Sequence, residues 1–256
     1  MAEISKYAII EPGAKIGEHV RIGPFSYIGP NVVIGNGCIV DNNVTITGNT
    51  VLGERNRVLP LAVIGTTAQS PDEVGYVQMG DANIVHEHAI VYGGAKDKPT
   101  RIGSDNLVMI GCRVGSGALI GDHGVFVNST HIGDGAIIED YVRTSGFIVI
   151  ESGITVGAYA FTLGYAELDR DVPPFAMVQG SPCRIRGVNA VKLQRCGFGE
   201  DDIRAIKSAF RELYNGGGEE PDGKVLQQLL KDNDINPHVR RLAEAVKAGE
   251  ARRVRE

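Results

Sequence analysis

Aliphatic residues recur at every sixth position over most of the first two-thirds of the chain. Over 4–64 every sixth residue is Ile, Val or Leu, and glycine often follows it directly. The pattern breaks at 66–78 and at 93–100, and over 102–156 it runs again with Thr144 as an exception. A period of six fits neither the 3.6-residue turn of an α-helix nor the two-residue alternation of a half-buried strand. It is typical of a parallel β-helix built from hexapeptides.

The repeat predicts a left-handed parallel β-helix over residues 1–186. Each hexapeptide supplies one short strand and one turn, and three hexapeptides close a triangular coil. The aliphatic side chain points into the prism, and the glycine after it permits the tight corner. Coils stack at the strand spacing of about 4.8 Å, so residues one coil apart lie in one column. The breaks at 66–78 and 93–100 become loops that project from the prism, where functional residues usually gather.

Helix signals replace the six-residue period toward the C-terminus and predict an α-helical domain over 187–256. A first helix at 200–214 begins with three acidic residues, which suit the helix dipole, and stops at the glycines of 216–218. A second helix is expected at about 223–232, and a third begins at 236–237 with proline in its first turn. The apolar face of the first helix consists of Ile203, Ile206, Phe210 and Leu213.

Composition and charge exclude several classes of protein. The net charge of −5 argues against a general nucleic-acid binder, which carries an excess of Lys and Arg. No apolar stretch approaches the roughly 18 residues of a membrane-spanning helix, and no secretory signal is visible. We expect neither disulfides nor a zinc site, and hence a cytoplasmic protein, because the cysteines are far apart and form no C-x-x-C pair. They are Cys38, Cys112, Cys183 and Cys196.

Specific stretches of sequence carry a resemblance to a known enzyme family. They are IGPF at 22–25, IGSDNLVMI at 102–110, DVPPFAMVQGSPCRIRGVN at 171–189 and RCGFGEDDIRAIKSAFRELY at 195–214. In these stretches the chain resembles the UDP-N-acetylglucosamine acyltransferases, which open lipid A biosynthesis by moving a 3-hydroxyacyl chain from acyl carrier protein to the sugar 3-hydroxyl. The resemblance implies a homotrimer with active sites between neighbouring prisms. It also implies a nucleotide-sugar substrate and an acyl-carrier-protein partner, with no cofactor besides the thioester co-substrate.

The histidines of that family's active site are replaced in this chain. An alignment without gaps places Ser116 on the family's general base and Arg113 on its companion histidine. Gly135 and Glu151 fall on two further histidine positions, and the stretch VYGGA at 91–95 places Tyr92 on another. General-base catalysis contributes about 10²–10⁴-fold to a rate, so the family's usual O-acylation mechanism does not carry over intact.

Other positions implied by the resemblance are retained. Gly146, Gly164 and Gly180 match glycines along the acyl cleft, where a larger residue would shorten the chain accepted. The alternative is that these glycines only serve coil corners. Asn189 and Arg195 match positions that hold the nucleotide, and Arg195 suits a phosphate. The alternative for Arg195 is an interaction with carbonyls at a helix end.

The column arrangement suggests a replacement for the lost base. His131 lies one coil beyond Arg113, and Asp134 lies one coil beyond Ser116, if the coils are regular. We therefore consider the hypothesis that His131 has taken the base role, with Asp134 or Glu151 nearby. The alternative is an exposed strand histidine without a chemical role.

A second histidine pair is a weaker candidate site. His86 and His88 flank Glu87, and strand alternation would place both imidazoles on one face with the carboxylate opposite. A metal site would need a third histidine in a spacing that the chain lacks, so we predict no metal. A ligand-binding role or a solvated pair of side chains remains.

Three functions remain open at this point. The chain could acylate the hydroxyl of a nucleotide-linked sugar with altered residues, or acylate an amino sugar that needs no strong base, from acyl carrier protein or CoA. It could also be an inactive trimeric homologue that binds nucleotide sugar or carrier protein. We assign Ser116, His131 and Glu151 to catalysis and Tyr92, Arg113 and Asp134 to the acceptor. A basic patch that would dock an acidic carrier protein could comprise Arg184, Arg186, Lys192 and Arg195.

Overall fold

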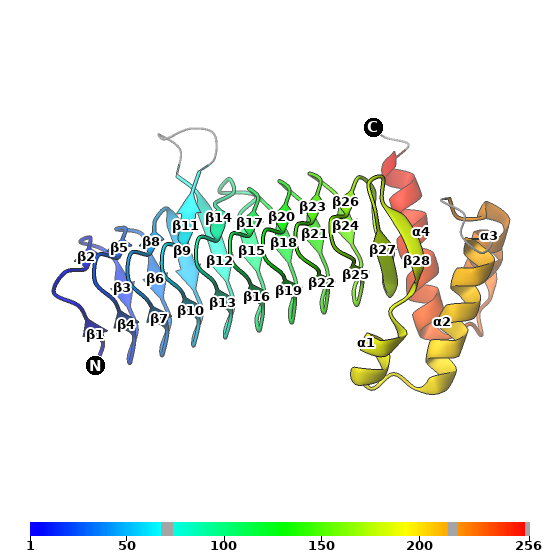
Figure 1. Ribbon diagram of the computed structural model, residues 1–256, viewed down its shortest axis with the longest axis horizontal. Coiled ribbons are helices and arrows are strands. Elements are labelled where there is room, and N and C mark those ends of the chain that lie inside the picture. The colour runs from blue at the N-terminus through cyan, green and yellow to red at the C-terminus, as the bar shows by residue number, and fades with distance from the viewer. Residues whose placement is uncertain (68–73, 215–219, 254–256) are drawn as a thin grey trace.

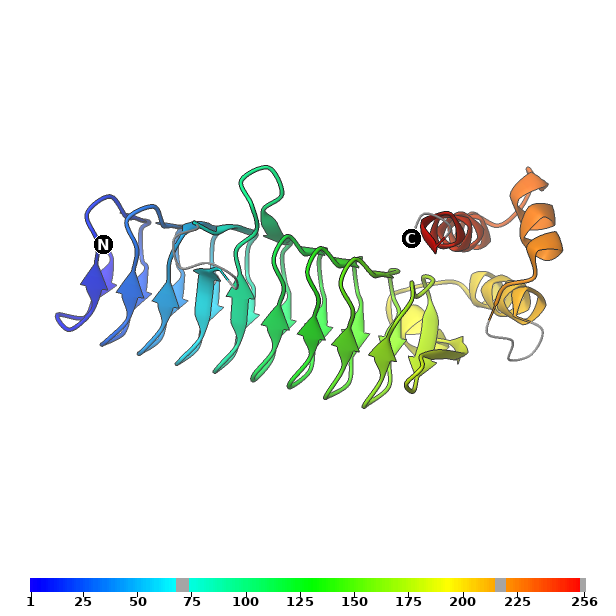
Figure 2. The ribbon, with the colours of Figure 1, turned by 90° about the horizontal axis from the view of Figure 1, so that it is seen from above.

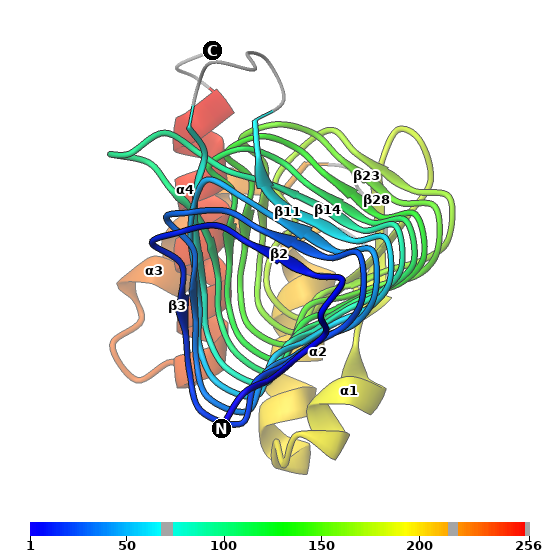
Figure 3. The ribbon, with the colours of Figure 1, turned by 90° about the vertical axis from the view of Figure 1, so that its left-hand side faces the viewer.

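The computed structural model describes residues 1–67, 74–214 and 220–253, which form an elongated prism followed by helices (Figure 1). Figure 3 looks along the prism and shows its triangular outline. Each face is one sheet, and neighbouring strands are parallel except in the final pair, β27 (Ala176–Gln179) and β28 (Arg184–Val188). The predicted left-handed parallel β-helix with a C-terminal helical domain is confirmed.

The strands of the three faces follow one another in rotation, except that the last two strands both belong to the first sheet. The first sheet contains β1 (Glu3–Ile4), β4 (Arg21–Ile22), β7 (Ile39–Val40), β10 (Arg57–Val58), β13 (Ile84–Val85), β16 (Leu107–Val108), β19 (Val125–Phe126), β22 (Arg143–Thr144), β25 (Phe161–Thr162), β27 (Ala176–Gln179) and β28 (Arg184–Val188). The second contains β2 (Ile9–Ile10), β5 (Tyr27–Ile28), β8 (Thr45–Ile46), β11 (Val63–Thr66), β14 (Ile90–Tyr92), β17 (Arg113–Val114), β20 (His131–Ile132), β23 (Val149–Ile150) and β26 (Glu167–Leu168). The third contains β3 (Lys15–Ile16), β6 (Val33–Ile34), β9 (Asn49–Leu52), β12 (Tyr76–Met79), β15 (Thr100–Ile102), β18 (Leu119–Ile120), β21 (Ile137–Ile138) and β24 (Thr155–Val156).

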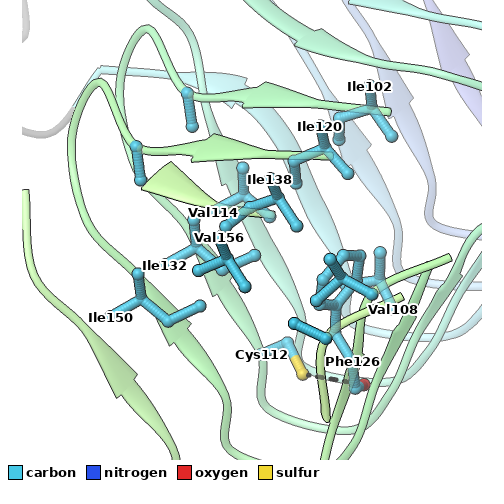
Figure 4. Close-up of a cluster of buried hydrophobic side chains, with 14 of the residues drawn as sticks. Ile102, Val108, Cys112, Val114, Ile120, Phe126, Ile132, Ile138, Ile150 and Val156 are labelled. Carbon is cyan, nitrogen blue, oxygen red and sulfur yellow. Dashed lines mark hydrogen bonds between the residues drawn. The ribbon is translucent and has the colours of Figure 1, made fainter. Parts of the chain in front are cut away.

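The core is the inward column of each face, and it consists of the residues of the six-residue repeat. In most two-residue strands the second residue is buried and the first faces outward. Figure 4 shows three such columns, with Ile102, Ile120, Ile138 and Val156 in one of them. Ile4 is 44% exposed, because it belongs to the first coil and no coil covers its outer side.

Thr144 interrupts the aliphatic repeat for a reason that lies inside the prism. It is fully buried, and its Oγ1 accepts the backbone N–H of Val127 at 2.9 Å. The hydroxyl of Thr130 donates to the Val127 carbonyl and lies 2.8 Å from Thr144 Oγ1, so Thr144 is the donor between the two hydroxyls. The polar residue therefore satisfies a backbone donor that the coil leaves free.

The corner glycines act differently from the prediction. Most glycines that directly follow an inward residue are needed for close approach: a β-carbon on Gly103 would lie 2.6 Å from the Gly121 carbonyl oxygen. The left-handed corner comes two residues later, and it accepts other residues as well as glycine. His19, His88 and His123 adopt φ values of 56–58° there.

Both breaks in the repeat are loops at one place along the prism, and each is shorter than predicted. Strand β11 ends at Thr66 and β12 begins at Tyr76, so the predicted loop 66–78 contracts to 67–75, of which 68–73 lie outside the described residues. The second loop, called here the 93–99 excursion, returns at Thr100 and stands clear of the prism in Figure 2. Tyr76 and Gly94 exchange backbone hydrogen bonds of 2.9 and 3.0 Å, which joins the bases of the two loops.

The helical domain begins after β28, which ends two residues beyond the predicted boundary at 186. It contains α1 (Ala190–Arg195), α2 (Glu200–Leu213), α3 (Gly223–Lys231) and α4 (Pro237–Arg253). The three predicted helices are confirmed, and α2 packs against β28 and α4 through the buried side of its apolar face. The short α1 was not predicted as a separate helix, and the predicted stop at 216–218 lies outside the described residues.

Candidate functional site

A cleft of about 510 Å³ opens where the two loops meet the prism. Its walls come from the loop bases and from two successive corners of the coils. Lys98 and Asp134 are the titratable side chains among the described residues that line it. The lining residues are Thr67, Val74, Gly93, Gly94, Ala95, Lys98, Ser116, Gly117, Asp134 and Gly135.

Ser116 and Asp134 meet in this cleft, as the column argument predicts. The Ser116 backbone N–H donates to Asp134 Oδ1 at 2.8 Å. The Ser116 hydroxyl donates to the Gly93 carbonyl oxygen at 3.1 Å. The proton of the hydroxyl is therefore directed at a backbone oxygen, which cannot remove it and so cannot activate the oxygen as a nucleophile.

Tyr92, Arg113 and His131 form a second group, which lies on the outer face of neighbouring strands. The guanidinium of Arg113 donates to Tyr92 Oη at 2.8 Å, and its central carbon lies 5.0 Å from the centre of the Tyr92 ring. Arg113 and His131 are direct partners on β17 and β20, so the predicted register is confirmed. These three residues do not line the cleft.

The surroundings of His131 favour its neutral form. Desolvation lowers the pKa of the imidazole below its usual value, and the positive charge of Arg113 lowers it further, while Asp134 opposes the shift. A neutral imidazole can accept a proton. His131 is nevertheless not among the described cleft residues, so its proposed role as a base remains a prediction.

Glu151 lies one coil beyond the cleft. A β-carbon on Gly133 would lie 2.6 Å from the carbonyl carbon of Glu151, which fixes the two residues as neighbours in one column. Glu151 is exposed and does not line the cleft. The geometry therefore does not bring Glu151 together with Ser116.

The structure adds one residue that the sequence reasoning missed. Lys98, in the 93–99 excursion, extends its side chain across two successive corners of the prism. Its Cδ and Cε would lie 3.5 Å from a β-carbon on Gly117, and its Nζ would lie 3.0 Å from one on Gly135. The available signals were a lysine in a loop of an otherwise regular solenoid and a glycine at an expected histidine position.

The pair His86 and His88 does not form the predicted arrangement. Residues 86–88 belong to a corner and not to a strand, and His88 has a φ of 58°, so alternation does not apply. His86 Nδ1 lies 3.1 Å from Glu87 Oε2, which places the carboxylate beside the ring and not opposite it. Nowhere in the described part of the chain do three His, Cys, Asp or Glu side chains gather in a way that could hold a metal ion.

Known proteins match this chain along most of its length. The family described as "Udp N-acetylglucosamine O-acyltransferase; Domain 2" matches residues 171–254, and "Bacterial transferase hexapeptide (six repeats)" matches 13–48. The acyl-[acyl-carrier-protein]–UDP-N-acetylglucosamine O-acyltransferase of Anaeromyxobacter sp. is 42% identical over 240 residues, or 91% of this chain and 93% of that protein. The chain belongs to the UDP-N-acetylglucosamine acyltransferase family.

Solved structures of the family have the same fold as this chain. The UDP-N-acetylglucosamine acyltransferase of Bacteroides fragilis matches with a TM-score of 0.88 at 30% identity, covering 96% of this chain and 97% of that one. The relative from Halorhodospira halophila is 37% identical over 92% of this chain and 94% of its own length. Among the described residues, no helix is both long and apolar enough to cross a membrane.

The glycines that match the acyl cleft of the acyltransferase family fall into two groups. Gly146 and Gly164 lie one above the other on successive coils, and β-carbons there would meet only ordinary contacts, at 3.5 Å or more. Neither has a positive φ, so corner geometry does not require glycine at these two positions. Gly180 does have a left-handed backbone, with a φ of 96°, in the turn between β27 and β28.

The residues that match nucleotide-binding positions of the family differ in exposure. Asn189 is buried, and its Nδ2 donates to the Tyr159 carbonyl at 2.9 Å, which ties the start of α1 to the prism. Arg195 is exposed in the last turn of α1, one turn from Lys192, whose ammonium lies over the Tyr141 ring at 5.1 Å. Of the two matched residues, Arg195 is therefore the one whose side chain is exposed at the surface.

Proposed function

We propose that the chain transfers an acyl group from a carrier thioester to an amino group on a nucleotide-linked sugar. The observation that carries the proposal is the chemistry of the cleft. Among the described residues that line it, no histidine is present, and the Ser116 hydroxyl donates to a backbone carbonyl. A sugar hydroxyl needs a base to become a nucleophile, whereas an amine that is partly neutral near pH 7 needs mainly positioning.

The rest of the family's substrate surface supports acyl transfer of some kind. Gly146 and Gly164 lie on adjacent coils and carry no side chain that would stand between an extended acyl chain and the prism. Arg184 and Arg186 are exposed on one face of β28, and Lys192 and Arg195 follow on α1. Positive charges so placed would attract an acidic acyl carrier protein, which we propose as the donor in preference to CoA.

We further propose that the protein works as a homotrimer. Phe147 and Tyr165 are 58% and 77% exposed and stack on each other, with ring centres 5.3 Å apart. Val149, 42% exposed, lies beside them on β23. Large apolar side chains grouped on a surface usually mark an interface, so a neighbouring prism would cover this patch. Sedimentation velocity should give a trimer, and a monomer at micromolar concentration would contradict this part of the proposal.

Transfer can be tested directly by mass spectrometry. The purified chain is incubated with 3-hydroxyacyl carrier protein or with acyl-CoA, and with UDP-N-acetylglucosamine or its 3-amino analogue in separate reactions. We expect acylation of the amino analogue by the carrier-protein thioester. Absence of product from every pair, with the protein folded and nucleotide sugar bound, would make the chain a binding protein and refute the proposal.

A further inference from the structure

Lys98 is held in place at both ends of its loop. The Lys98 backbone N–H donates to the Ala95 carbonyl at 3.1 Å, which closes a tight turn. Two residues later, the Thr100 hydroxyl donates to the Tyr92 carbonyl at 2.7 Å and accepts the Gly117 N–H at 2.9 Å. The 93–99 excursion is thus pinned to the coil that it crosses, and its lysine is directed along the wall of the cleft.

The ammonium of Lys98 lies close to Gly135. Gly135 has a φ of 64°, but the equivalent corners elsewhere hold His19, His88 and His123 at nearly the same φ. The backbone alone therefore does not require glycine at this corner. A β-carbon at 135 would lie 3.0 Å from Lys98 Nζ, tighter than ordinary contact, so a larger residue would displace the ammonium. Position 135 is also one of those where the aligned family carries histidine.

Among the described residues, the Lys98 ammonium lies beside polar groups of the cleft without an ion-pair partner. Asp134 and Ser116 line the same cleft, yet the described residues place no carboxylate within ion-pair distance of Lys98. Asp134 Oδ1 accepts a hydrogen bond from the Ser116 N–H. A lysine ammonium carries a positive charge and N–H donors, and the cleft offers both to a substrate oxygen.

We infer that Lys98 is a catalytic residue of the proposed acyl transfer, and the inference rests on that proposed function. The acceptor nitrogen attacks the thioester carbonyl and forms a C–N bond, while the π electrons of the carbonyl move onto its oxygen. Lys98 Nζ donates a hydrogen bond to this oxyanion. Collapse breaks the C–S bond and releases the thiolate, which takes up a proton from water, and the acylated nitrogen loses one proton to water. No other reactant is needed.

The first test compares Lys98→Met with Lys96→Met, which removes an exposed lysine from the same loop. Loss of one oxyanion donor typically costs about 10²–10³-fold in kcat. We expect Lys98→Met to lower kcat by about that factor with KM for the nucleotide sugar nearly unchanged, and Lys98→Arg to recover part of the rate. Equal rates for the two methionine variants would overturn the catalytic role of Lys98 but not the proposed acyl transfer. A wild-type protein that transfers nothing would overturn the proposed function, and this role with it.

The second test displaces the lysine without changing it. Gly135→Asn places a side chain that tolerates the left-handed corner, as Asn43 does with a φ of 54°, directly against Nζ. Gly111→Asn is the matched control, because a β-carbon there would meet only Ser129 Oγ at 3.7 Å. We expect Gly135→Asn to lower kcat by about the same factor as Lys98→Met. The double variant that combines Gly135→Asn with Lys98→Met should then be no slower than either single variant. Independent effects that multiply would contradict the inference, and thermal unfolding verifies that all variants fold.

Discussion

The two buried threonines of one column provide a sharp test of how the prism is stabilised. Thr144 and Thr162 are partners on β22 and β25, and both are fully buried. Thr144 bonds with the Val127 N–H and with Thr130, whereas Thr162 Oγ1 has no partner among the described residues. Valine has the same shape as threonine, so Thr144→Val and Thr162→Val change the same group in two different settings.

The expected stability changes have opposite directions. Thr144→Val leaves the buried N–H of Val127 without an acceptor, which costs about 1–3 kcal/mol. Thr162→Val removes a buried hydroxyl that bonds with nothing and adds a methyl group to the core, so it should be neutral or stabilising. For a chain of this size, 1 kcal/mol corresponds to about 2–4 °C in Tm. Thr144→Val should therefore melt several degrees below Thr162→Val.

Calorimetry at one fixed protein concentration, supported by urea midpoints, measures the difference, because oligomers melt in a concentration-dependent way. Equal melting temperatures for the two variants, or a lower one for Thr162→Val, would refute the assignment of these hydrogen bonds. The aliphatic repeat alone predicts that valine is favourable at both positions. The experiment therefore separates the contribution of the aliphatic repeat to thermal stability from the contribution of the Thr144 hydrogen bonds.

The structure predicts three further outcomes. In an NMR titration the pKa of His131 should lie below 6.5, and Arg113→Gln should raise it, because a neighbouring positive charge disfavours the imidazolium; an unchanged pKa would remove Arg113 as a cause. Gly164→Met should shorten the preferred acyl chain while leaving Tm nearly unchanged, as measured with donors of graded length; an unaltered preference would separate Gly164 from the acyl path. Iodoacetamide at pH 8 should label half-exposed Cys196 and leave Cys183 unmodified, because burial raises the pKa of the Cys183 thiol to about 11; rapid labelling of Cys183 would contradict that burial.

The register of the prism could be predicted because it depends only on the period. Three hexapeptides per coil place Arg113 beside His131 and Ser116 beside Asp134, and both pairs are found. The loop bounds were less accurate, since Tyr76 already belongs to a strand although it departs from the aliphatic pattern. A residue can thus pair in a sheet without taking part in the repeat.

The site itself depends on contacts that no period describes. The 93–99 excursion brings Lys98 to corners far from it in sequence, and the path of a short loop is set by hydrogen bonds such as that of Thr100 to Tyr92. Local geometry also overrode the strand assumption at His86 and His88, which lie at a corner. The proposed acceptor role of the cleft follows from the lost histidines, but the position of Lys98 beside Gly135 could not be predicted from the sequence.

The central claim is that this member of the family acylates an amine. An acceptor competition tests it most directly: equimolar UDP-N-acetylglucosamine and its 3-amino analogue are offered to the wild-type protein with one 3-hydroxyacyl carrier-protein donor. The ratio of the two products, measured by mass spectrometry at early times, gives the ratio of the two kcat/KM values. We predict a large excess of the N-acylated product. Predominance of the O-acylated product would contradict the account, since acylation of a hydroxyl needs a general base and no histidine is among the described residues that line the cleft.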